Sequence, residues 1–390
     1  MTHAKLEKIL GKTSRQTLGL MSGTSGDGLD ITACVVGSDT GFLGTLASET
    51  VPYPPRLREK VLQIAQSGAI ELHELISLSQ YLGHFYADAI EQFCSKQKIT
   101  LADIDLIGVH GQTVAHLAKP NQFLDRMVTG TLQIGEAEVI AKRFGIVTVS
   151  DFRSGDIAVG GSGAPLVPIY HKCVFAHEGV DYLVVNIGGI ANITVLNGIE
   201  SCTATDTGPG NCLIDTVVNE RTGKRFDDNG QLASAGTIDE SLLNKLLSAE
   251  VFQRQFPASH DRGEILRLLQ DEDISRALAK LNLESALATL GELTAITTRR
   301  AYEQLSGSTV PNTVYVCGGG AHNGFLNARL KQHFPDSMIV KTGAMGKDED
   351  FVEAEAFAFL ANLALDELTG NMPQVTGAKR AAVIGKISLP

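Results

Sequence analysis

The chain has 390 residues, with 33 Lys and Arg against 44 Asp and Glu, for a formal net charge of -11. This acidic balance argues against a broad polyanion-binding face, so we expect no nucleic-acid partner. Hydrophobic residues make up 43% and charged residues 20%, which is ordinary for a globular protein and excludes wholesale disorder. Because the length exceeds the size at which one hydrophobic core usually keeps growing, we expect two domains.

The amino-terminal residues and the cysteines indicate a cytoplasmic protein without membrane contact. Residues 1–16 are polar and lack the apolar core of a signal peptide, and no run approaches the roughly 18 apolar residues of a membrane span. The six cysteines show no CxxC spacing and are expected to be reduced thiols. Gly11-Lys12-Thr13 is similar to the end of a P-loop, but Leu6 stands where that motif needs glycine. Residues 1–15 are therefore expected to form a short helix or loose arm.

The first half of the chain is expected to open with a hairpin. An apolar strand at 17–21 runs into a Gly-rich polar turn and then into a second strand at 31–37. Hydrophobic periodicity and the positions of glycine and proline then predict, in chain order, helices within 54–98, a buried strand at 106–111, a helix at 137–144, a strand at 145–152 and a loop at 153–168.

The opening pattern returns at 182–198, where an apolar strand, a Gly-rich turn and a β-rich strand follow one another. This architectural repeat predicts two related α/β halves. The remaining elements are expected to be a helix at 284–304, a strand and glycine turn at 313–320, and helices at 323–333 and 353–368. We place domain I at 1–150, joined by a C-terminal helix at about 370–390, and domain II at 151–369.

Three glycine-rich turns are the strongest signal of function. Residues 23–28 and 186–192 supply backbone NH groups with little steric obstruction, as close approach to a polyphosphate requires. A third turn, at 317–323, could serve tight helix packing or contact with adenosine equally well. One such turn mostly serves backbone conformation, but three together favour a nucleotide site.

Several carboxylates stand beside strand ends or glycine turns, where they could bind metal, cap turns or act as bases. They are Asp27, Asp151, Asp156, Asp206 and Glu353. Phosphoryl transfer needs one carboxylate that takes a proton from the attacking group, and Asp151 at the end of a strand is the leading candidate. A turn cap, or an ion pair with Arg153, is the alternative interpretation of Asp151.

Two polar motifs suit a carbohydrate ligand. HGQTVAH contains His110 and His116, but it has no helical i,i+4 pair and no cysteine partner, so a polar loop that hydrogen-bonds a sugar is preferred to a zinc site. DTGPGN, at 206–211, offers hydroxyl, amide and carboxylate groups. It could also be only a turn ahead of a helix, with Asn211 near the N-cap.

Eight blocks together make the chain similar to a known family. They are MSGTSGDGLD, GVHGQTVAH, LQIGEAEVIA, VSDFRSGDIAVGGSGAPLVP, NIGGIANIT, DTGPGN, CGGGAHNGFL and VEAEAFAFLA, and they span residues 21–362. In content and order they resemble the signature blocks of the anhydro-N-acetylmuramic acid kinases.

The resemblance implies an α/β, two-domain actin-like (ribonuclease H-like) ATPase fold with an interdomain active-site cleft, in the fold group of hexokinases, heat-shock chaperones and actin. It implies that ATP phosphorylates 1,6-anhydro-N-acetylmuramic acid while water opens the anhydro bridge. The product would be N-acetylmuramic acid 6-phosphate, for recycling of the cell wall. Mg²⁺ would accompany ATP, with Asp27 as its protein ligand.

The resemblance also implies roles for single residues. Asp151 would be the catalytic base that deprotonates the attacking water, with Glu353 as a supporting carboxylate. The ATP-binding residues would be Gly23, Thr24, Ser25, Gly26, Asp27, Gly28, Leu29 and Asp30 in the first turn, Asn186, Gly188, Gly189 and Asn192 in the second, and Gly318, Gly319, Gly320 and Asn323 on the adenosine side. The sugar-binding residues would be His110, Gln112, Thr113, Arg153, Asp206, Gly208 and Asn211.

The chain departs from the family's usual sequence at Gly26, where a larger apolar residue is common, and at Ser162, where glutamine is common.

Two other functions are weighed against the kinase. Paired carboxylates such as Asp151 and Glu353 could hydrolyse a glycosidic bond without nucleotide, which leaves the three glycine turns unexplained. A non-catalytic clamp would close on ATP without turnover. The Ala- and Phe-rich helix at 353–368 permits a homodimer without requiring one.

Overall fold

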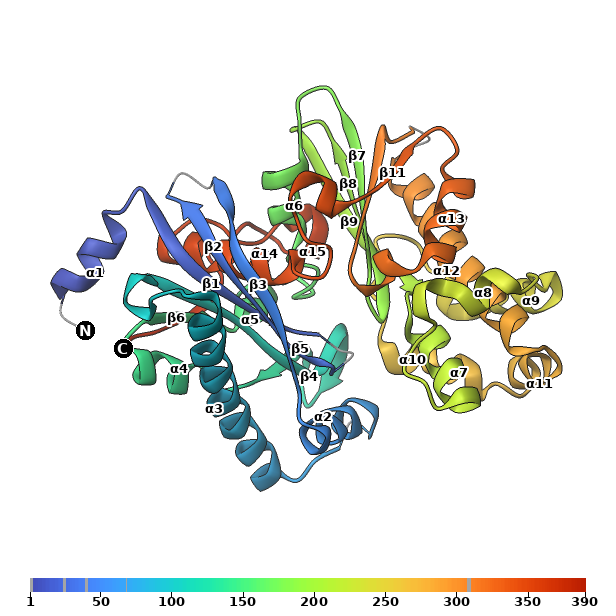
Figure 1. Cartoon of the computed structure of the whole chain (residues 1–390), viewed down its shortest axis with the longest axis horizontal. Coiled ribbons are helices and arrows are strands. Elements are labelled where there is room, and N and C mark those ends of the chain that lie inside the picture. Colours follow the sequence, from blue (N-terminus) through green and yellow to red (C-terminus); the bar gives the residue numbers. More distant parts are fainter. Residues whose placement is uncertain (1–2, 24–25, 39–40, 68, 307–309) are drawn as a thin grey trace. The chain divides into compact units, whose positions relative to one another are not determined.

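A computed structural model describes residues 3–23, 26–38, 41–67, 69–306 and 310–390. The chain divides into two compact units, the first comprising Met1–Val174 with Phe351–Pro390 and the second Phe175–Asp350. Each unit has its own sheet and its own helices (Figure 1). The expected boundaries, after residues 150 and 369, differ from these. The second boundary differs because helix α14 (Val352–Leu365) packs on strands of the first unit.

The sheet of the first unit has the order β12-β6-β4-β1-β2-β3. Its antiparallel part consists of β1 (Ser14–Ser22), β2 (Gly28–Gly37) and β3 (Phe42–Pro52). Strand β4 (Leu106–Phe123) runs parallel to β1, and β6 (Val147–Ser150) runs parallel to β4. Strand β5 (Arg126–Ile134) pairs with the distal part of β4, and β12 (Lys386–Ser388) forms the antiparallel edge.

Alternation along the strands separates the two faces of this sheet. Leu18 and Leu20 share a hydrophobic core with residues of α3 (Leu72–Gln97), whose buried side chains recur at helical spacing. The neighbouring positions, Gly19 and Gly108, face α14. A Cβ at Gly19 would lie 1.9 Å from the Ala354 carbonyl oxygen, and one at Gly108 would lie 2.2 Å from the Phe357 carbonyl oxygen. Both glycines are therefore required for α14 to approach the strands.

The remaining helices of the first unit are short or lie at its periphery. They are α1 (His3–Leu10), α2 (Pro55–Ser67), α4 (Ala137–Phe144), α5 (Phe152–Ala158), α6 (Pro168–Phe175, which ends at the unit boundary) and α15 (Pro373–Thr376), with a 3-10 turn at Leu101–Asp103.

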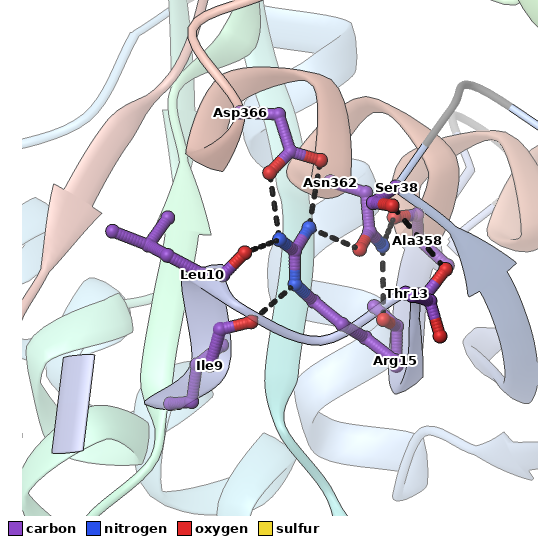
Figure 2. Close-up of polar contacts among 9 residues, drawn as sticks. Ile9, Leu10, Thr13, Arg15, Ser38, Ala358, Asn362 and Asp366 are labelled. Carbon is purple, nitrogen blue, oxygen red and sulfur yellow. Dashed lines mark hydrogen bonds and ion pairs between the residues drawn. The ribbon is translucent and has the colours of Figure 1, made fainter. Parts of the chain in front are cut away.

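A buried arginine fastens the N-terminal arm to α14 (Figure 2). Arg15 is 1% exposed, and its NH1 and NH2 atoms each donate to one oxygen of Asp366 at 2.7 Å. Its Nε donates to the Ile9 carbonyl oxygen at 3.0 Å, and NH1 also donates to Asn362 at 3.3 Å. A two-pronged, charge-assisted contact of this kind is among the strong hydrogen-bond geometries in proteins. The arm is therefore held to the first unit rather than loose.

The second unit contains the sheet order β11-β10-β7-β8-β9. The strands are β7 (Asp181–Ile187), β8 (Ile190–Asn197), β9 (Ser201–Pro209), β10 (Thr313–Cys317) and β11 (Met338–Lys341). The helices are α7 (Cys212–Thr222), α8 (Gln231–Ala235), α9 (Glu240–Ser248), α10 (Arg262–Leu266), α11 (Glu272–Lys280), α12 (Leu283–Ser306) and α13 (Gly324–His333). The core includes apolar side chains of α12, α7 and α9 together with β7 and β8.

The two sheets repeat one construction. In each, three consecutive antiparallel strands are followed by two strands that run parallel to the first of the three. The order β3-β2-β1-β4-β6 thus corresponds to β9-β8-β7-β10-β11. This confirms the expected pair of related α/β halves and the actin-like fold class. Across the described residues, the helices are too short or too polar to cross a membrane.

Three sequence-based expectations about local structure are wrong. Residues 110–116 belong to strand β4, because β5 extends the sheet beside them. The expected loop at 153–168 begins instead with most of helix α5. The C-terminal helix expected at about 370–390 is replaced by the short α15 and strand β12. Gly377 and Gly385 adopt positive φ angles of 74° and 109°, which an α-helix does not accommodate.

Candidate active site

The first glycine turn connects β1 to β2 in the first unit. Thr24 and Ser25 lie outside the described residues, so the structure gives the ends of the turn. Gly26 has a φ of +63°, and a Cβ on Gly28 would lie 2.5 Å from the Val51 carbonyl oxygen. Both positions therefore favour glycine for steric reasons. The Leu29 side chain is 1% exposed and Asp30 accepts a hydrogen bond from Thr50 at 2.6 Å, so these two residues also serve the sheet.

Asp27 is the exposed carboxylate of this turn. Its Oδ1 accepts from the Arg58 NH2 and Nε atoms at 3.2 and 3.3 Å, and its carbonyl oxygen accepts from the Tyr53 amide at 3.0 Å. Among the described residues there is no group of three or more His, Cys, Asp and Glu that could hold a metal ion. A metal at Asp27 would thus take its other ligands from phosphates and water, which is the usual habit of Mg²⁺.

Gln112 lies beneath the first turn and is 1% exposed. Its Nε2 donates to the Gly23 carbonyl oxygen at 3.1 Å and to the Thr113 carbonyl oxygen at 3.3 Å. Its Oε1 accepts from the Ser22 hydroxyl at 2.6 Å and from the Tyr53 hydroxyl at 3.3 Å. The half-buried Thr113 hydroxyl accepts from Gln133 at 3.1 Å. The amide of Gln112 is thus directed at the turn.

His110 and Arg153 form a contact pair. Arg153 Nε donates to His110 Nε2 at 2.9 Å, and Arg153 NH1 donates to the Gly163 carbonyl oxygen at 2.9 Å. Because Nε2 accepts, the proton of His110 resides on Nδ1, which donates to the Gly111 carbonyl oxygen at 2.7 Å. Burial, and then the Arg153 charge, lower the pKa of His110 well below its ordinary value. The imidazole is therefore neutral, and both of its nitrogens are occupied.

Asp151 follows β6 and has an unusual backbone. Its φ and ψ are 50° and 52°, in the left-handed region that residues with a Cβ seldom occupy. It stands at the N-cap position of α5, but its side chain makes no capping hydrogen bond. Its Oδ2 forms an ion pair with Lys386 Nζ at 2.5 Å, and its side chain is 26% exposed. The turn-cap interpretation is therefore wrong, and the outlying conformation is of the kind that concentrates at functional sites.

The other acidic residues of the first unit differ in setting. Asp156 is fully buried and accepts from the Gly163 amide at 2.8 Å and from Asn371 and Thr376 at 2.7 Å each, so it fixes the chain around it. Ser162 binds the same region, because its hydroxyl donates to the Ala164 carbonyl oxygen at 2.6 Å. Glu353 lies half-buried in the first turn of α14.

In the second unit the three remaining motifs meet at the ends of β7 and β10. The carbonyl oxygens of Gly188 and Gly189 accept from the amides of residues 210–212 at 2.8 to 3.2 Å. A Cβ on Gly210 would lie 2.2 Å from the Gly188 carbonyl oxygen. Gly318 has a φ of +76°, and a Cβ there would lie 2.4 Å from Asn186 Oδ1, while one on Gly320 would lie 2.3 Å from the Ile187 side chain. The second and third turns are thus packed against each other.

Several predicted residues of the second unit have clear local roles. Asn323 is buried and caps α13 by accepting from the Leu326 amide at 3.1 Å, which favours the packing interpretation of its motif. Asp206 Oδ2 accepts from the His260 amide at 2.9 Å. Asn211 donates to the Ile187 carbonyl oxygen at 3.3 Å.

The other predicted residues of this unit are described by their backbone. Asn192 pairs with Asn186 across β7 and β8, and Gly208 adopts a φ of +135°. The side chain next to Gly319, that of Asn211, lies 3.9 Å from a Cβ built there.

A pocket of the second unit adjoins the DTGPGN motif. Thr207, His260 and Thr297 line it together with two arginines, Arg254 and Arg300, and apolar walls from Phe252 and Phe256. Arg254 is paired with Glu264. The lining offers hydroxyl groups, cations and aromatic surface, a mixture that suits a polar ligand with apolar substituents.

Sequence reasoning missed the partners that hold the predicted residues. Lys386 pairs with Asp151, and Ser22, Tyr53 and Tyr86 complete the network around Gln112. Ser22 lies within the first signature block, whereas Lys386 and the two tyrosines stand in stretches without any motif. Their roles depend on contacts between distant segments, for which a single sequence contains no direct signal.

The repeated α/β units, each with a glycine turn between its first two strands, define the actin-like class of nucleotide-binding proteins. The family model described as "Anhydro-N-acetylmuramic acid kinase" matches residues 15–390. The chain belongs to this family.

Curated relatives agree over nearly the whole chain. The chain is 39% identical over 375 residues to the anhydro-N-acetylmuramic acid kinase of Vibrio vulnificus (strain CMCP6), covering 96% of this chain and 98% of that protein. It is 38% identical over 395 residues to the kinase of the same name from Caldanaerobacter subterraneus subsp. tengcongensis, covering 99% of this chain and all of that protein (100%).

Solved structures resemble the chain more weakly. The activator of the 2-hydroxyisocaproyl-CoA dehydratase from Clostridium difficile, with bound ADPNP, matches with a TM-score of 0.44 and 12% identity over 90% of this chain and 96% of that chain. A ROK family glucokinase from Streptomyces griseus, in complex with glucose and AMPPNP, matches with a TM-score of 0.39 and 11% identity over 89% of this chain and 99% of that chain.

Proposed function

We propose that this chain is an ATP-dependent sugar kinase that converts 1,6-anhydro-N-acetylmuramic acid and water into N-acetylmuramic acid 6-phosphate during peptidoglycan recycling. Membership of the family, over residues 15–390, supports the activity. The observation that carries the chemistry is Asp151, a partly exposed carboxylate held in a left-handed conformation at a strand end without serving as a cap.

The proposed reaction combines a ring opening with a phosphoryl transfer. Asp151 takes a proton from water, and the water oxygen bonds to the anomeric carbon while the bond from that carbon to O6 breaks. The freed O6 bonds to the γ-phosphorus, and the bond to the β-bridging oxygen breaks, which releases ADP. Lys386 holds Oδ2 of Asp151 at 2.5 Å, so it fixes the orientation of the base. Glu353 is proposed as the supporting carboxylate.

The sugar is proposed to bind through groups of both units. In the first unit, Arg153 is held from two sides by His110 and the Gly163 carbonyl oxygen, which pre-orients its guanidinium for the lactyl carboxylate. In the second unit, Asp206, Gly208 and Asn211 stand in the predicted motif. The neighbouring Phe252 and Phe256 supply apolar surface for the N-acetyl and lactyl groups.

The triphosphate is proposed to contact the backbone NH groups of the first and second glycine turns, with Gly318–Gly320 on the adenosine side. Mg²⁺ bound to ATP, with Asp27 as a protein ligand, would offset the phosphate charge. A cytoplasmic location and a homodimer stay predictions. Neither alternative function gains support, since the family whose model matches residues 15–390 is a family of kinases.

The test is ADP release measured with and without 1,6-anhydro-N-acetylmuramic acid, together with identification of the sugar product by mass spectrometry. We expect the sugar to stimulate ADP release and to become phosphorylated in equal amount. ADP release that ignores the sugar would indicate the nucleotide clamp. Ring opening without ATP would indicate the hydrolase.

A further inference from the structure

A buried polar network holds the first glycine turn, with parts from strands β1 and β4 and from the residue that follows β3. Gln112 of β4 and Ser22 of β1 meet at 2.6 Å, and Tyr53, which follows β3, lies 2.5 Å from the Ser22 hydroxyl. The three side chains are 1%, 1% and 5% exposed. We define them as the turn clamp.

The amide of Gln112 has no donor hydrogen left for a sugar. A primary amide offers two donor hydrogens and two acceptor lone pairs. In Gln112, the donors reach the carbonyl oxygens of Gly23 and Thr113, and Oε1 accepts from the Ser22 hydroxyl at 2.6 Å, with the Tyr53 hydroxyl at 3.3 Å. Gln112 is 1% exposed, and Gly23 belongs to the turn itself.

The clamp holds both ends of the turn. At the start, Gln112 binds the Gly23 carbonyl oxygen at 3.1 Å. At the end, the Tyr53 amide donates to the Asp27 carbonyl oxygen at 3.0 Å, and the Ser22 hydroxyl lies 3.3 Å from the Gly28 carbonyl oxygen. The carbonyl oxygens of Gly23 and Asp27 are thereby held at fixed points, the first by the Gln112 side chain and the second by the Tyr53 backbone.

The surroundings keep the clamp in its hydrogen-bonding form. The Tyr53 hydroxyl lies 3.2 Å from that of Tyr86, which is fully buried. Burial raises the pKa of Tyr53 to about 12, so its hydroxyl retains its proton at neutral pH. Gly135, from the LQIGEAE block, makes room for Tyr86, because a Cβ there would lie 2.5 Å from the Tyr86 ring.

We propose that the turn clamp of Gln112, Ser22 and Tyr53 positions the first glycine turn for the phosphates of ATP, and that Gln112 is a positioning residue rather than a sugar ligand. The proposal rests on the proposed function only in taking nucleotide as the ligand of this turn. Donors that are already in place when the anion arrives need no costly ordering on binding. Without the clamp, each binding event must order the turn, so nucleotide affinity falls while sugar affinity stays.

The experiment uses Tyr53→Phe, which removes one hydroxyl, and Gln112→Met, which removes the amide at similar volume. Tyr315→Phe, at a buried tyrosine of the second unit, is the matched control. Titration calorimetry measures the Kd of a non-hydrolysable ATP analogue and, separately, the Kd of 1,6-anhydro-N-acetylmuramic acid. Circular dichroism checks that each variant is folded.

For Tyr53→Phe we expect the Kd of the ATP analogue to rise about tenfold, as loss of one or two positioning hydrogen bonds allows, with the Kd of the sugar within about twofold of the wild type. Gln112→Met should have the same pattern, and Tyr315→Phe should change neither. Weakened sugar binding with unchanged nucleotide binding would overturn the proposal, as would unchanged nucleotide binding in folded Tyr53→Phe.

The readout separates this proposal from the proposed function. If the wild type binds the ATP analogue but fails to phosphorylate the sugar, the proposed function fails and the effect of the clamp on nucleotide affinity is still decided. If the wild type binds no nucleotide, both fail. If Gln112→Met does not fold, Tyr53→Phe alone decides between the two outcomes.

Discussion

The two glycine turns occupy equivalent places in two equivalent sheets, yet they are held in different ways. The first turn is held at its start by a side chain, because Gln112 Nε2 binds the Gly23 carbonyl oxygen, and at its end by the Tyr53 backbone amide, which binds the Asp27 carbonyl oxygen. The second is fixed by the backbone, because amides of residues 210–212 bind the carbonyl oxygens of Gly188 and Gly189.

This difference follows from the length of each turn. Strands β7 and β8 are separated by two residues, Gly188 and Gly189, so backbone contacts suffice to fix their connection. Strands β1 and β2 are separated by residues 23–27, and a longer loop needs extra contacts to hold one shape. Two halves with the same sheet order can therefore hold their glycine turns through different contacts.

The largest effect is expected at Asp151, the proposed catalytic base. In the proposed reaction, ATP bound at the two glycine turns is consumed only when this base activates water. Asp151→Asn keeps the size of the side chain but removes the proton acceptor, so turnover should fall by at least about 10²-fold. Folding and ATP binding should persist, as checked by circular dichroism and calorimetry. Near-normal turnover in the folded variant would move the role of base to another residue.

A steric clash should disrupt the second turn, whereas the loss of hydrogen bonds should disrupt the first. Gly210→Ala places a Cβ 2.2 Å from the Gly188 carbonyl oxygen, so the backbone must shift, and the free energy of unfolding should fall by about 2 kcal/mol or more. The matched control is Gly319→Ala, whose Cβ would lie no closer than 3.9 Å to its nearest neighbour. The chain lacks tryptophan, so denaturation is followed by circular dichroism. Equal stability of the two variants would contradict the steric account.

A glycine inside the second turn gives a smaller and more selective effect. A Cβ on Gly188 would lie 3.5 Å from the Ile190 carbonyl oxygen, which is ordinary contact, so Gly188→Ala should fold with near-wild-type stability. If phosphate approaches this backbone, the Kd of an ATP analogue should still rise roughly tenfold, because the new methyl group obstructs that approach. Unchanged nucleotide affinity would remove Gly188 from the phosphate site.

The last effect concerns pH and the first unit. Burial lowers the pKa of His171 from 6.5 to about 3, and burial with the Arg153 charge lowers that of His110. Below pH 6.5 the unfolded chain binds protons at these sites and the folded chain does not, so stability is complete above pH 6.5 and falls as the pH decreases. At pH 5 His171 should cost about 2 kcal/mol relative to pH 7.5, and His110 should act in the same direction.

Denaturation of wild type and His171→Gln at both pH values checks this expectation. The variant should lose less stability than the wild type on acidification, because one of the two proton-linked sites is gone. An equal loss in both proteins would show that His171 takes up its proton in the folded state.

The parts of the fold and site that are local in sequence could be predicted. Glycine turns, strand periodicity and the helix that contains Glu353 each depend on neighbouring residues, so 23–28, 186–192 and α14 were found from the chain alone. Asp151 was singled out because it ends a strand, and its position there is confirmed.

The remaining features depend on long-range pairing. The direction of the Gln112 side chain follows from the pairing of β4 with β1 and β5, so the sequence could not distinguish a sugar ligand from a positioning residue. Lys386 reaches Asp151 only because β12 pairs with β6, and the glycines that break the expected C-terminal helix make that strand possible.

The central claim is that Asp151 activates water at the anomeric carbon while O6 receives the phosphoryl group. The most direct measurement runs the reaction in water labelled with heavy oxygen, quenches it early, and locates the label by mass spectrometry. The account predicts label on the anomeric oxygen of the sugar product and none in its phosphate group. Label in the phosphate would show that water attacks phosphorus instead, and would contradict the account.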